Sequence, residues 1–94
     1  MPLTVVFIGA FRHISGKAQM KVECKKPCSI EELVNKICLE TPKLKESLIE
    51  EQSGVAKTNA LILVNGREIS VLSGLETQLA DGDEVVFVPV VHGG

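Results

Sequence analysis

The sequence has no concentration of positive charge. Its 94 residues include 10 Lys and Arg against 12 Asp and Glu, so the formal net charge is -2. The densest basic group, Lys21, Lys25 and Lys26, is interrupted by Glu23. Because nucleic acids and anionic membrane surfaces are bound through clustered cations, we expect neither as a partner.

Apolar runs long enough for a membrane span are missing too. No window approaches the ~20 predominantly apolar residues that a transmembrane helix needs. The N-terminal residues carry neither the basic start nor the apolar stretch of a secretory signal peptide. We therefore expect a cytoplasmic protein.

Cysteine is scarce, and its number is odd. The three residues Cys24, Cys28 and Cys38 do not suggest a disulfide framework in a chain without a signal peptide. Their C-x3-C-x9-C spacing is not a recognisable zinc pattern, and His92 is the only plausible fourth ligand. We expect buried or half-buried thiols, with no metal site and no cofactor.

Motifs for independent catalysis are also lacking. No phosphate-binding loop of the form G-x-x-x-x-G-K-[ST] occurs, and neither His13 nor His92 has a nucleophile beside it in sequence. A nucleophilic pair of Cys28 or Cys38 with His13 is an alternative that only the fold can test. We expect a protein that is not an enzyme by itself.

The composition that is present suits one globular domain. Apolar residues make up 45% of the chain and charged residues 23%, with no internal repeat and no linker. We expect a single domain over residues 1–94, in which residues 91–94 form a flexible C-terminal diglycine tail.

Apolar patterning predicts an α+β domain. Strands are expected over residues 2–11, 19–25, 60–64 and 84–90, with a brief strand over 69–72. Helices are expected over 30–40 and 43–51, turns over 13–17, 65–66 and 81–83, and a loop over 52–59. The second strand alternates apolar and charged residues, which is typical of a sheet edge.

The main helix has the clearest signals. Ser29 and Glu32 form a capping box, and Pro42 disfavours a helical Thr41. The apolar stripe behind the cap consists of Ile30, Leu33, Val34, Ile37 and Cys38. Burying this stripe contributes on the order of 8 to 12 kcal/mol before entropy costs.

The first and last strands are apolar on both faces, so they belong in the middle of a sheet. Since no short turn can join them, we expect a parallel pair with the helix crossing one face. The second face is either an exposed surface for a partner or is covered by the second helix and the loops.

The sequence ends in Gly93-Gly94 directly after the last strand. Glycine has no Cβ and can enter a channel too narrow for other residues. A terminal carboxylate has a reference pKa of about 3.3 to 3.7, so it is ionised at neutral pH and is a poor acyl donor. Acyl chemistry at Gly94 would therefore require activation by another protein.

Residues 65–94 resemble the C-terminal half of the small ubiquitin-like sulfur carriers, and most closely the molybdopterin synthase small-subunit family. The matching features are Asn65-Gly66, Leu79-x-Asp81-Gly82-Asp83-Glu84-Val85, Phe87-x-Pro89 and Gly93-Gly94. The resemblance implies a β-grasp (ubiquitin-like) mixed sheet with one main helix packed on one face.

The resemblance also implies a mechanism. An E1-like, ATP-dependent activating enzyme would adenylate the carboxylate of Gly94, and a sulfur donor would convert it to a thiocarboxylate. The tail would then enter the large subunit of molybdopterin synthase and donate sulfur to a pterin precursor. Gly93 and Gly94 would carry this chemistry. The residues expected near the docking surface are Phe87, Pro89, Val90 and His92.

Two alternatives remain at this point. His92 before the glycines is more similar to the ubiquitin-related modifier that thiolates tRNA, which implies a protein modifier or a tRNA-thiolation carrier. A plain binding module with an incidental tail is the other alternative. Removal of Gly93-Gly94 would distinguish it, since only a carrier would then lose its activity.

Overall fold

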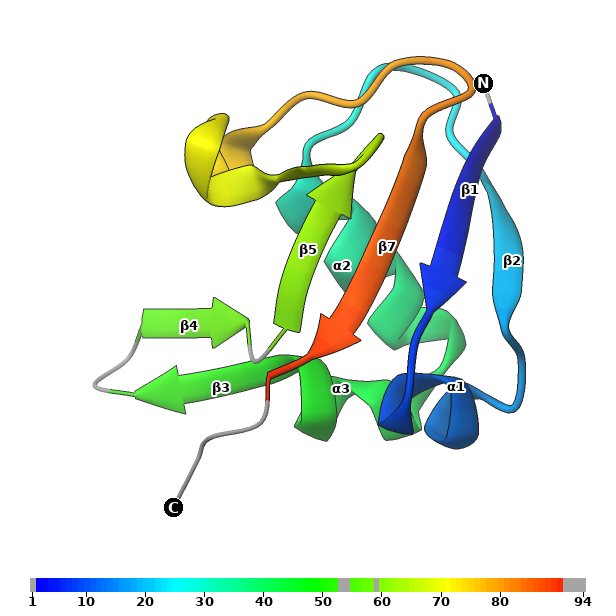
Figure 1. The fold of residues 1–94 in the computed structure, drawn as a ribbon, viewed down its shortest axis with the longest axis vertical. Coiled ribbons are helices and arrows are strands. Elements are labelled where there is room, and N and C mark those ends of the chain that lie inside the picture. The colour runs from blue at the N-terminus through cyan, green and yellow to red at the C-terminus, as the bar shows by residue number, and fades with distance from the viewer. Residues whose placement is uncertain (1, 53–54, 59, 91–94) are drawn as a thin grey trace.

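The computed structural model describes residues 2–52, 55–58 and 60–90. Its main sheet has five strands in the order β2-β1-β7-β5-β6, and α2 lies across one face (Figure 1). The elements are β1 (Pro2–Phe7), α1 (Ala10–Ser15), β2 (Gln19–Glu23), α2 (Ile30–Glu40), α3 (Pro42–Leu48), β3 (Ile49–Gln52), β4 (Val55–Thr58), β5 (Ala60–Val64), β6 (Arg67–Glu68), the 3-10 turns η1 (Ile69–Val71) and η2 (Gly74–Glu76), and β7 (Glu84–Pro89).

The centre of the sheet confirms the expected pairing of the first and last strands. β1 and β7 run parallel, with Val5 opposite Val85 and Phe7 opposite Phe87. All four side chains are buried on the face that α2 covers. The two Phe rings stack with their centroids 6.0 Å apart. β2 is an edge strand, as its alternating pattern predicted.

The first strand is shorter than the sequence predicted. It ends at Phe7, and residues expected to continue the strand and form a turn instead form α1. Gly9 has φ 58, which interrupts the extended backbone, and Gly16 with φ 76 closes the helix. The short helix returns Phe11 to the core, where it is buried. Burial of Phe11 thus comes from α1 and not from an extended strand.

The main helix confirms its predicted bounds and its cap. The Ser29 amide donates to Glu32 Oε1 at 3.2 Å, and the Glu32 amide donates to Ser29 Oγ at 3.2 Å. The whole predicted apolar stripe is buried against the sheet. The cap therefore fixes where α2 begins, and the stripe fixes which side faces the sheet.

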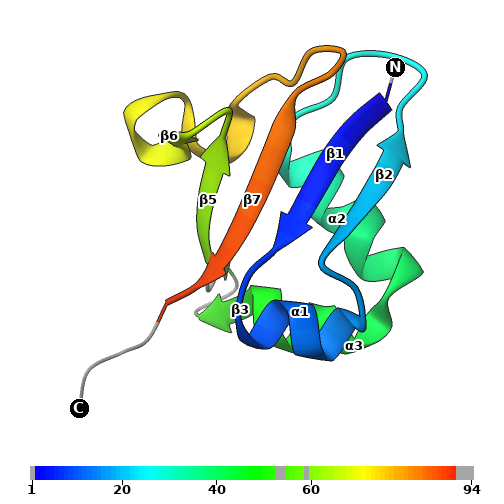
Figure 2. The same ribbon diagram turned by 45° about the vertical axis from the view of Figure 1, so that its right-hand side comes forward.

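The segment after α2 differs from the prediction. The second helix, α3, ends at Leu48 and not at residue 51. β3 then begins where the helix was expected to continue, β4 lies in the expected loop, and the two strands form a separate antiparallel pair. α3 buries Leu44 and Leu48 and packs against α1 and α2 (Figure 2). The sequences of β3 and β4 are IEEQ and VAKT, and neither has the repeated apolar alternation that would predict a hairpin.

The predicted turn at Asn65-Gly66 is confirmed. Both residues have positive φ, 48 and 85, as a tight hairpin turn requires. Asn65 Nδ2 donates to Asp83 Oδ1 at 2.9 Å, and the Glu84 amide donates to Asn65 Oδ1 at 2.9 Å. These bonds tie the turn to the beginning of β7. The strand expected over residues 69–72 is wrong: β6 comes earlier, and residues 69–71 form η1.

Replacing Ser29 with Ala should lower the free energy of unfolding by about 1 kcal/mol, because the first turn of α2 loses its side-chain acceptor. Urea denaturation followed by circular dichroism measures the change. Ser70→Ala is the matched control, since Ser70 is exposed in η1 and should change stability by less than about 0.5 kcal/mol. Equal stability of the Ser29→Ala and Ser70→Ala proteins would contradict the role of the cap.

Candidate functional site

One face of the main sheet has no helix across it among the described residues. In Figures 1 and 2, α2 crosses the opposite face, whereas α1 and α3 lie at the end of the sheet where β1 and β7 finish. We call the uncovered surface the open face. Its apolar residues come from β1, β5 and β7 and from the residue after β1: Val6, Ile8, Leu61, Leu63, Val86 and Val88.

The open face is a continuous apolar surface. Val86 lies between Val6 and Leu63, and Val88 lies beside Leu61 in the strand register. Leu61 is 37% exposed and Ile8 is 43% exposed, and the other four are half-buried. The second face of the sheet was expected either to be exposed or to be covered by the second helix and the loops. The structure favours exposure, because α3 packs against α1 and α2 and not on this face. Surfaces of this kind are typical of protein–protein contacts.

The end of β7 places the predicted docking residues in three different environments. Phe87 is fully buried on the helix-facing side, so its ring supports the strand and is not accessible to a partner. Pro89 is half-buried beside Gly9, and Val90 is 46% exposed. The Ile8 amide donates to the Phe87 carbonyl at 3.0 Å, so β7 is held by its neighbour close to its end.

The tail itself lies outside the described residues. The roles predicted for His92, Gly93 and Gly94, and the flexibility predicted for residues 91–94, stay predictions. The structure places the base of the tail: Val90 follows the central strand at the edge of the open face. A partner that holds the tail would thus meet the apolar surface next to it.

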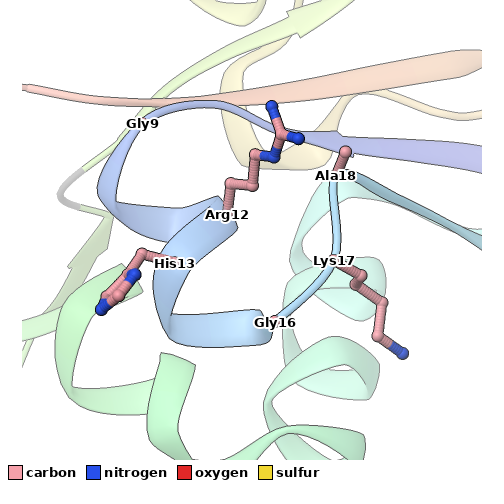
Figure 3. Close-up of a pocket in the computed structure, with 6 residues that line it drawn as sticks. All are labelled: Gly9, Arg12, His13, Gly16, Lys17 and Ala18. Carbon is pink, nitrogen blue, oxygen red and sulfur yellow. The ribbon is translucent and has the colours of Figure 1, made fainter.

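The alternative Cys-His pair receives no support from the described residues. His13 lines a pocket of about 390 Å³ with Gly9, Arg12, Gly16, Lys17 and Ala18, and this lining contains no sulfur (Figure 3). Cys38 lines a separate pocket with Asn35, Leu39 and Lys45. The β2–α2 connection, which carries Cys28, lies at the other end of the sheet from α1 (Figure 1).

The pocket beside α1 carries nitrogen-bearing side chains that do not converge. Figure 3 shows Arg12, His13 and Lys17 pointing in three different directions.

In the described part of the chain, no group of three or more His, Cys, Asp and Glu side chains is placed to hold a metal ion. No helix in the same residues has the length and apolarity for a membrane span.

Comparison with known proteins identifies the family. The family model described as the ThiS family matches residues 5–94. The chain belongs to the ThiS family of ubiquitin-like sulfur carriers. The mixed sheet with α2 on one face is the β-grasp fold of this family, as the sequence predicted.

Relatives of this ThiS-family chain include small archaeal modifier proteins and a chain from a molybdopterin-converting factor complex. Small archaeal modifier protein 3 of Haloferax volcanii is 32% identical over 94 residues, which cover 100% of both chains. Small archaeal modifier protein 1 of Methanosarcina acetivorans has a TM-score of 0.83 and 26% identity, covering 99% of this chain and 96% of that one. A chain from the complex of subunits 1 and 2 of the molybdopterin-converting factor of Helicobacter pylori has a TM-score of 0.59 and 26% identity, covering 100% of both chains.

Adjacent residues of β7 provide a test of the two faces. Val85→Thr should lower the free energy of unfolding by about 1 to 3 kcal/mol, because it places a hydroxyl in the fully buried core. Val86→Thr should change it by less than about 0.5 kcal/mol, because Val86 is half-buried on the open face and Thr is also β-branched. Urea denaturation measures both. A loss of 1 kcal/mol or more in Val86→Thr would mean that the open face is covered.

Proposed function

We propose that this chain is a sulfur carrier that works through the carboxylate of Gly94. An E1-like, ATP-dependent enzyme adenylates this carboxylate, and a sulfur donor converts it to a thiocarboxylate. The observation that carries the proposal is the continuous apolar open face beside the base of the tail. Membership of the ThiS family supports the same chemistry.

The proposed chemistry divides the work between this chain and its partners. Attack of the Gly94 carboxylate on the α-phosphate of ATP releases pyrophosphate and forms an acyl adenylate. Sulfur from the donor, at the oxidation level of sulfide, then attacks the carbonyl carbon: a carbon–sulfur bond forms, the carbon–oxygen bond to AMP breaks, and AMP leaves. Gly93 and Gly94 have no side chain beyond the backbone, so they can enter a narrow catalytic channel. The sheet supplies the rigid body that presents them.

The open face gives this body a surface for the activating enzyme and the sulfur acceptor. Apolar area buried on binding contributes roughly 25 cal/mol per Å² before the costs of association. Val90, exposed at the end of β7, extends this surface towards the tail. Phe87 supports this surface indirectly, because its buried ring on the opposite side of the sheet holds β7 in place. Pro89 packs beside Gly9.

The first acceptor that we propose is the pterin precursor of the molybdenum cofactor, bound to a molybdopterin synthase large subunit. Two observations support this choice. The run from Leu79 to Pro89 resembles the small-subunit family, and the Helicobacter pylori relative was solved as a complex of subunits 1 and 2 of the molybdopterin-converting factor. The protein would work in the cytoplasm, where ATP is available for activation.

A second candidate is a ubiquitin-like modifier or a tRNA-thiolation carrier. The full-length relative of Haloferax volcanii is a small archaeal modifier protein, and His92 precedes the two glycines here. The activation step is common to both candidates. The two therefore differ only in the molecule that attacks the activated carbonyl or receives its sulfur.

Incubation with a cognate activating enzyme, ATP and a sulfur source should replace one oxygen atom of Gly94 by sulfur. Intact-mass analysis and fragmentation of the C-terminal peptide would locate the change at Gly94. The chain lacking Gly93-Gly94 is the control: it should keep its fold by circular dichroism and show no such mass change. An unmodified Gly94 beside an enzyme that is active on another carrier would reject the proposal.

Leu61→Glu should abolish sulfur transfer to a large subunit while leaving the free energy of unfolding within about 1 kcal/mol, because Leu61 is partly exposed on the open face. The assay compares pre-formed thiocarboxylate of the variant and the wild type with purified large subunit and pterin precursor. Leu39→Glu, on the exposed side of α2, is the matched control and should transfer normally.

The transfer assay with purified components, together with an assay in cell extract, separates the two acceptors. Molybdopterin formation with the wild-type thiocarboxylate supports the first candidate. Lysine conjugates or thiolated tRNA in cell extract, without molybdopterin from the purified system, would replace it by the second. Normal transfer by Leu61→Glu would exclude the open face as the docking surface.

A further inference from the structure

Two of the three cysteine side chains are in contact. Cys24 Sγ lies 3.3 Å from Cys28 Sγ, and the residues are only 7% and 6% exposed. Cys24 directly follows β2, and Cys28 precedes the Ser29 cap of α2. Both cysteines are thiols in the structure. The sequence spacing alone did not predict this contact.

The fold fixes the backbone on both sides of this pair. The Leu79 amide donates to the Cys28 carbonyl at 2.8 Å, and Ser29 next to it is held in the capping box. On the other side, Lys36 Nζ donates to the carbonyl of Glu23, the residue before Cys24. The packing of the fold therefore holds the two sulfur atoms as neighbours.

A small reagent can reach the pair from one side. A surface hollow of about 230 Å³ is lined by Cys24, Lys25, Lys26, Cys28, Glu32 and Lys36. Three of these six residues are lysines and one is acidic, which favours approach by an anion. Low-molecular-weight disulfides with carboxylate groups, such as glutathione disulfide, have this charge.

We propose that Cys24 and Cys28 form a redox-active dithiol that a low-molecular-weight disulfide oxidises reversibly to an intramolecular disulfide. This site is separate from the proposed chemistry at Gly94 and does not rest on it. The β2–α2 connection and the end of β7 lie at opposite ends of the sheet (Figure 1).

The reaction consists of two thiol–disulfide exchanges. The Cys24 thiolate attacks one sulfur of the small disulfide, which forms a mixed disulfide and releases one small thiolate. The Cys28 thiolate then attacks the Cys24 sulfur and releases the second small thiolate. The two protons lost by the cysteines end on the two small thiols, and the small disulfide accepts two electrons. The sulfur–sulfur separation falls from 3.3 Å to about 2.0 Å.

The environment of Cys28 suits this order of attack. Burial, followed by the hydrogen bond and charge of Cys24, raises the pKa of Cys28 to about 11. The charge of Glu32 also raises this pKa, whereas the charge of Lys36 lowers it. Cys28 is therefore protonated at neutral pH while Cys24 is reduced. Once Cys24 is in a mixed disulfide, its hydrogen bond and charge no longer raise the Cys28 pKa. Burial, the largest cause, still raises this pKa, so the second step depends on the contact between the two sulfur atoms, 3.3 Å apart.

The disulfide would join the end of β2 to the residue before the α2 cap. Restricting this connection in the unfolded chain raises stability, and the short loop limits the size of the effect. We expect the oxidised protein to melt about 5 °C or more above the reduced protein. The shift would report closure of this particular pair, since Cys38 lies near the other end of α2.

The test uses the full chain, reduced and then equilibrated with glutathione disulfide. Acid quenching, alkylation under denaturing conditions and intact-mass analysis should show loss of two hydrogens and one remaining alkylated thiol at Cys38. Dithiothreitol should restore three alkylated thiols. The Cys38→Ser protein is the matched control and should form the same disulfide with no alkylated thiol left.

Single variants test the order of the steps. Cys28→Ser should stop at a stable glutathione adduct on Cys24, whereas Cys24→Ser should form its adduct on Cys28 more slowly, because burial still raises the pKa of Cys28. The Cys28→Ala protein repeats the first measurement if the Ser variant is poorly folded. Three free thiols in the wild type after equilibration, a disulfide that includes Cys38, or two separate glutathione adducts would each overturn the proposal.

Discussion

The structure depends on the parallel pairing of β1 with β7. These strands come from opposite ends of the described chain, and their buried residues, Val5, Phe7, Val85 and Phe87, form the middle of the core. A parallel pair cannot be closed by a turn, so the intervening chain must cross the sheet, and α2 makes that crossing. The same pairing anchors the strand from which the tail departs. Core and candidate site are therefore stabilised by one set of contacts.

A single crossing helix leaves the sheet asymmetric. The residues of β7 alternate between a buried side under α2 and a half-exposed side, although the side chains on both sides are mostly apolar. A sheet that only had to be stable would carry polar residues on its exposed side. The valines and leucines of the open face are thus consistent with the docking surface proposed above. A docking surface agrees with the structure of the Helicobacter pylori relative, which is a complex of subunits 1 and 2 of the molybdopterin-converting factor.

The parts that were predictable from sequence are those with a local chemical signal. Ser29 and Glu32 predicted the start of α2, and Asn65-Gly66 predicted a hairpin turn with positive φ. The end of β1 was missed because Gly9 interrupts a run that remains apolar through Phe11. The β3–β4 hairpin was missed because its strands have no apolar alternation. The Cys24–Cys28 contact was missed because it depends on the path of the β2–α2 connection, which Leu79 and Lys36 hold through hydrogen bonds. The open face was predictable as apolar, but its exposure required knowing where α3 packs.

Pro89 shows how a single imino acid shapes the boundary between body and tail. It pairs opposite Ala60 as the last residue of β7, yet it has no amide hydrogen to give to a neighbouring strand. The last position of the central strand therefore lacks a backbone donor for its neighbour. A ring with one fixed dihedral also limits the directions in which the chain can leave the sheet. The pyrrolidine ring thus marks a boundary at which the backbone ladder of the sheet can terminate, before the C-terminal residues begin.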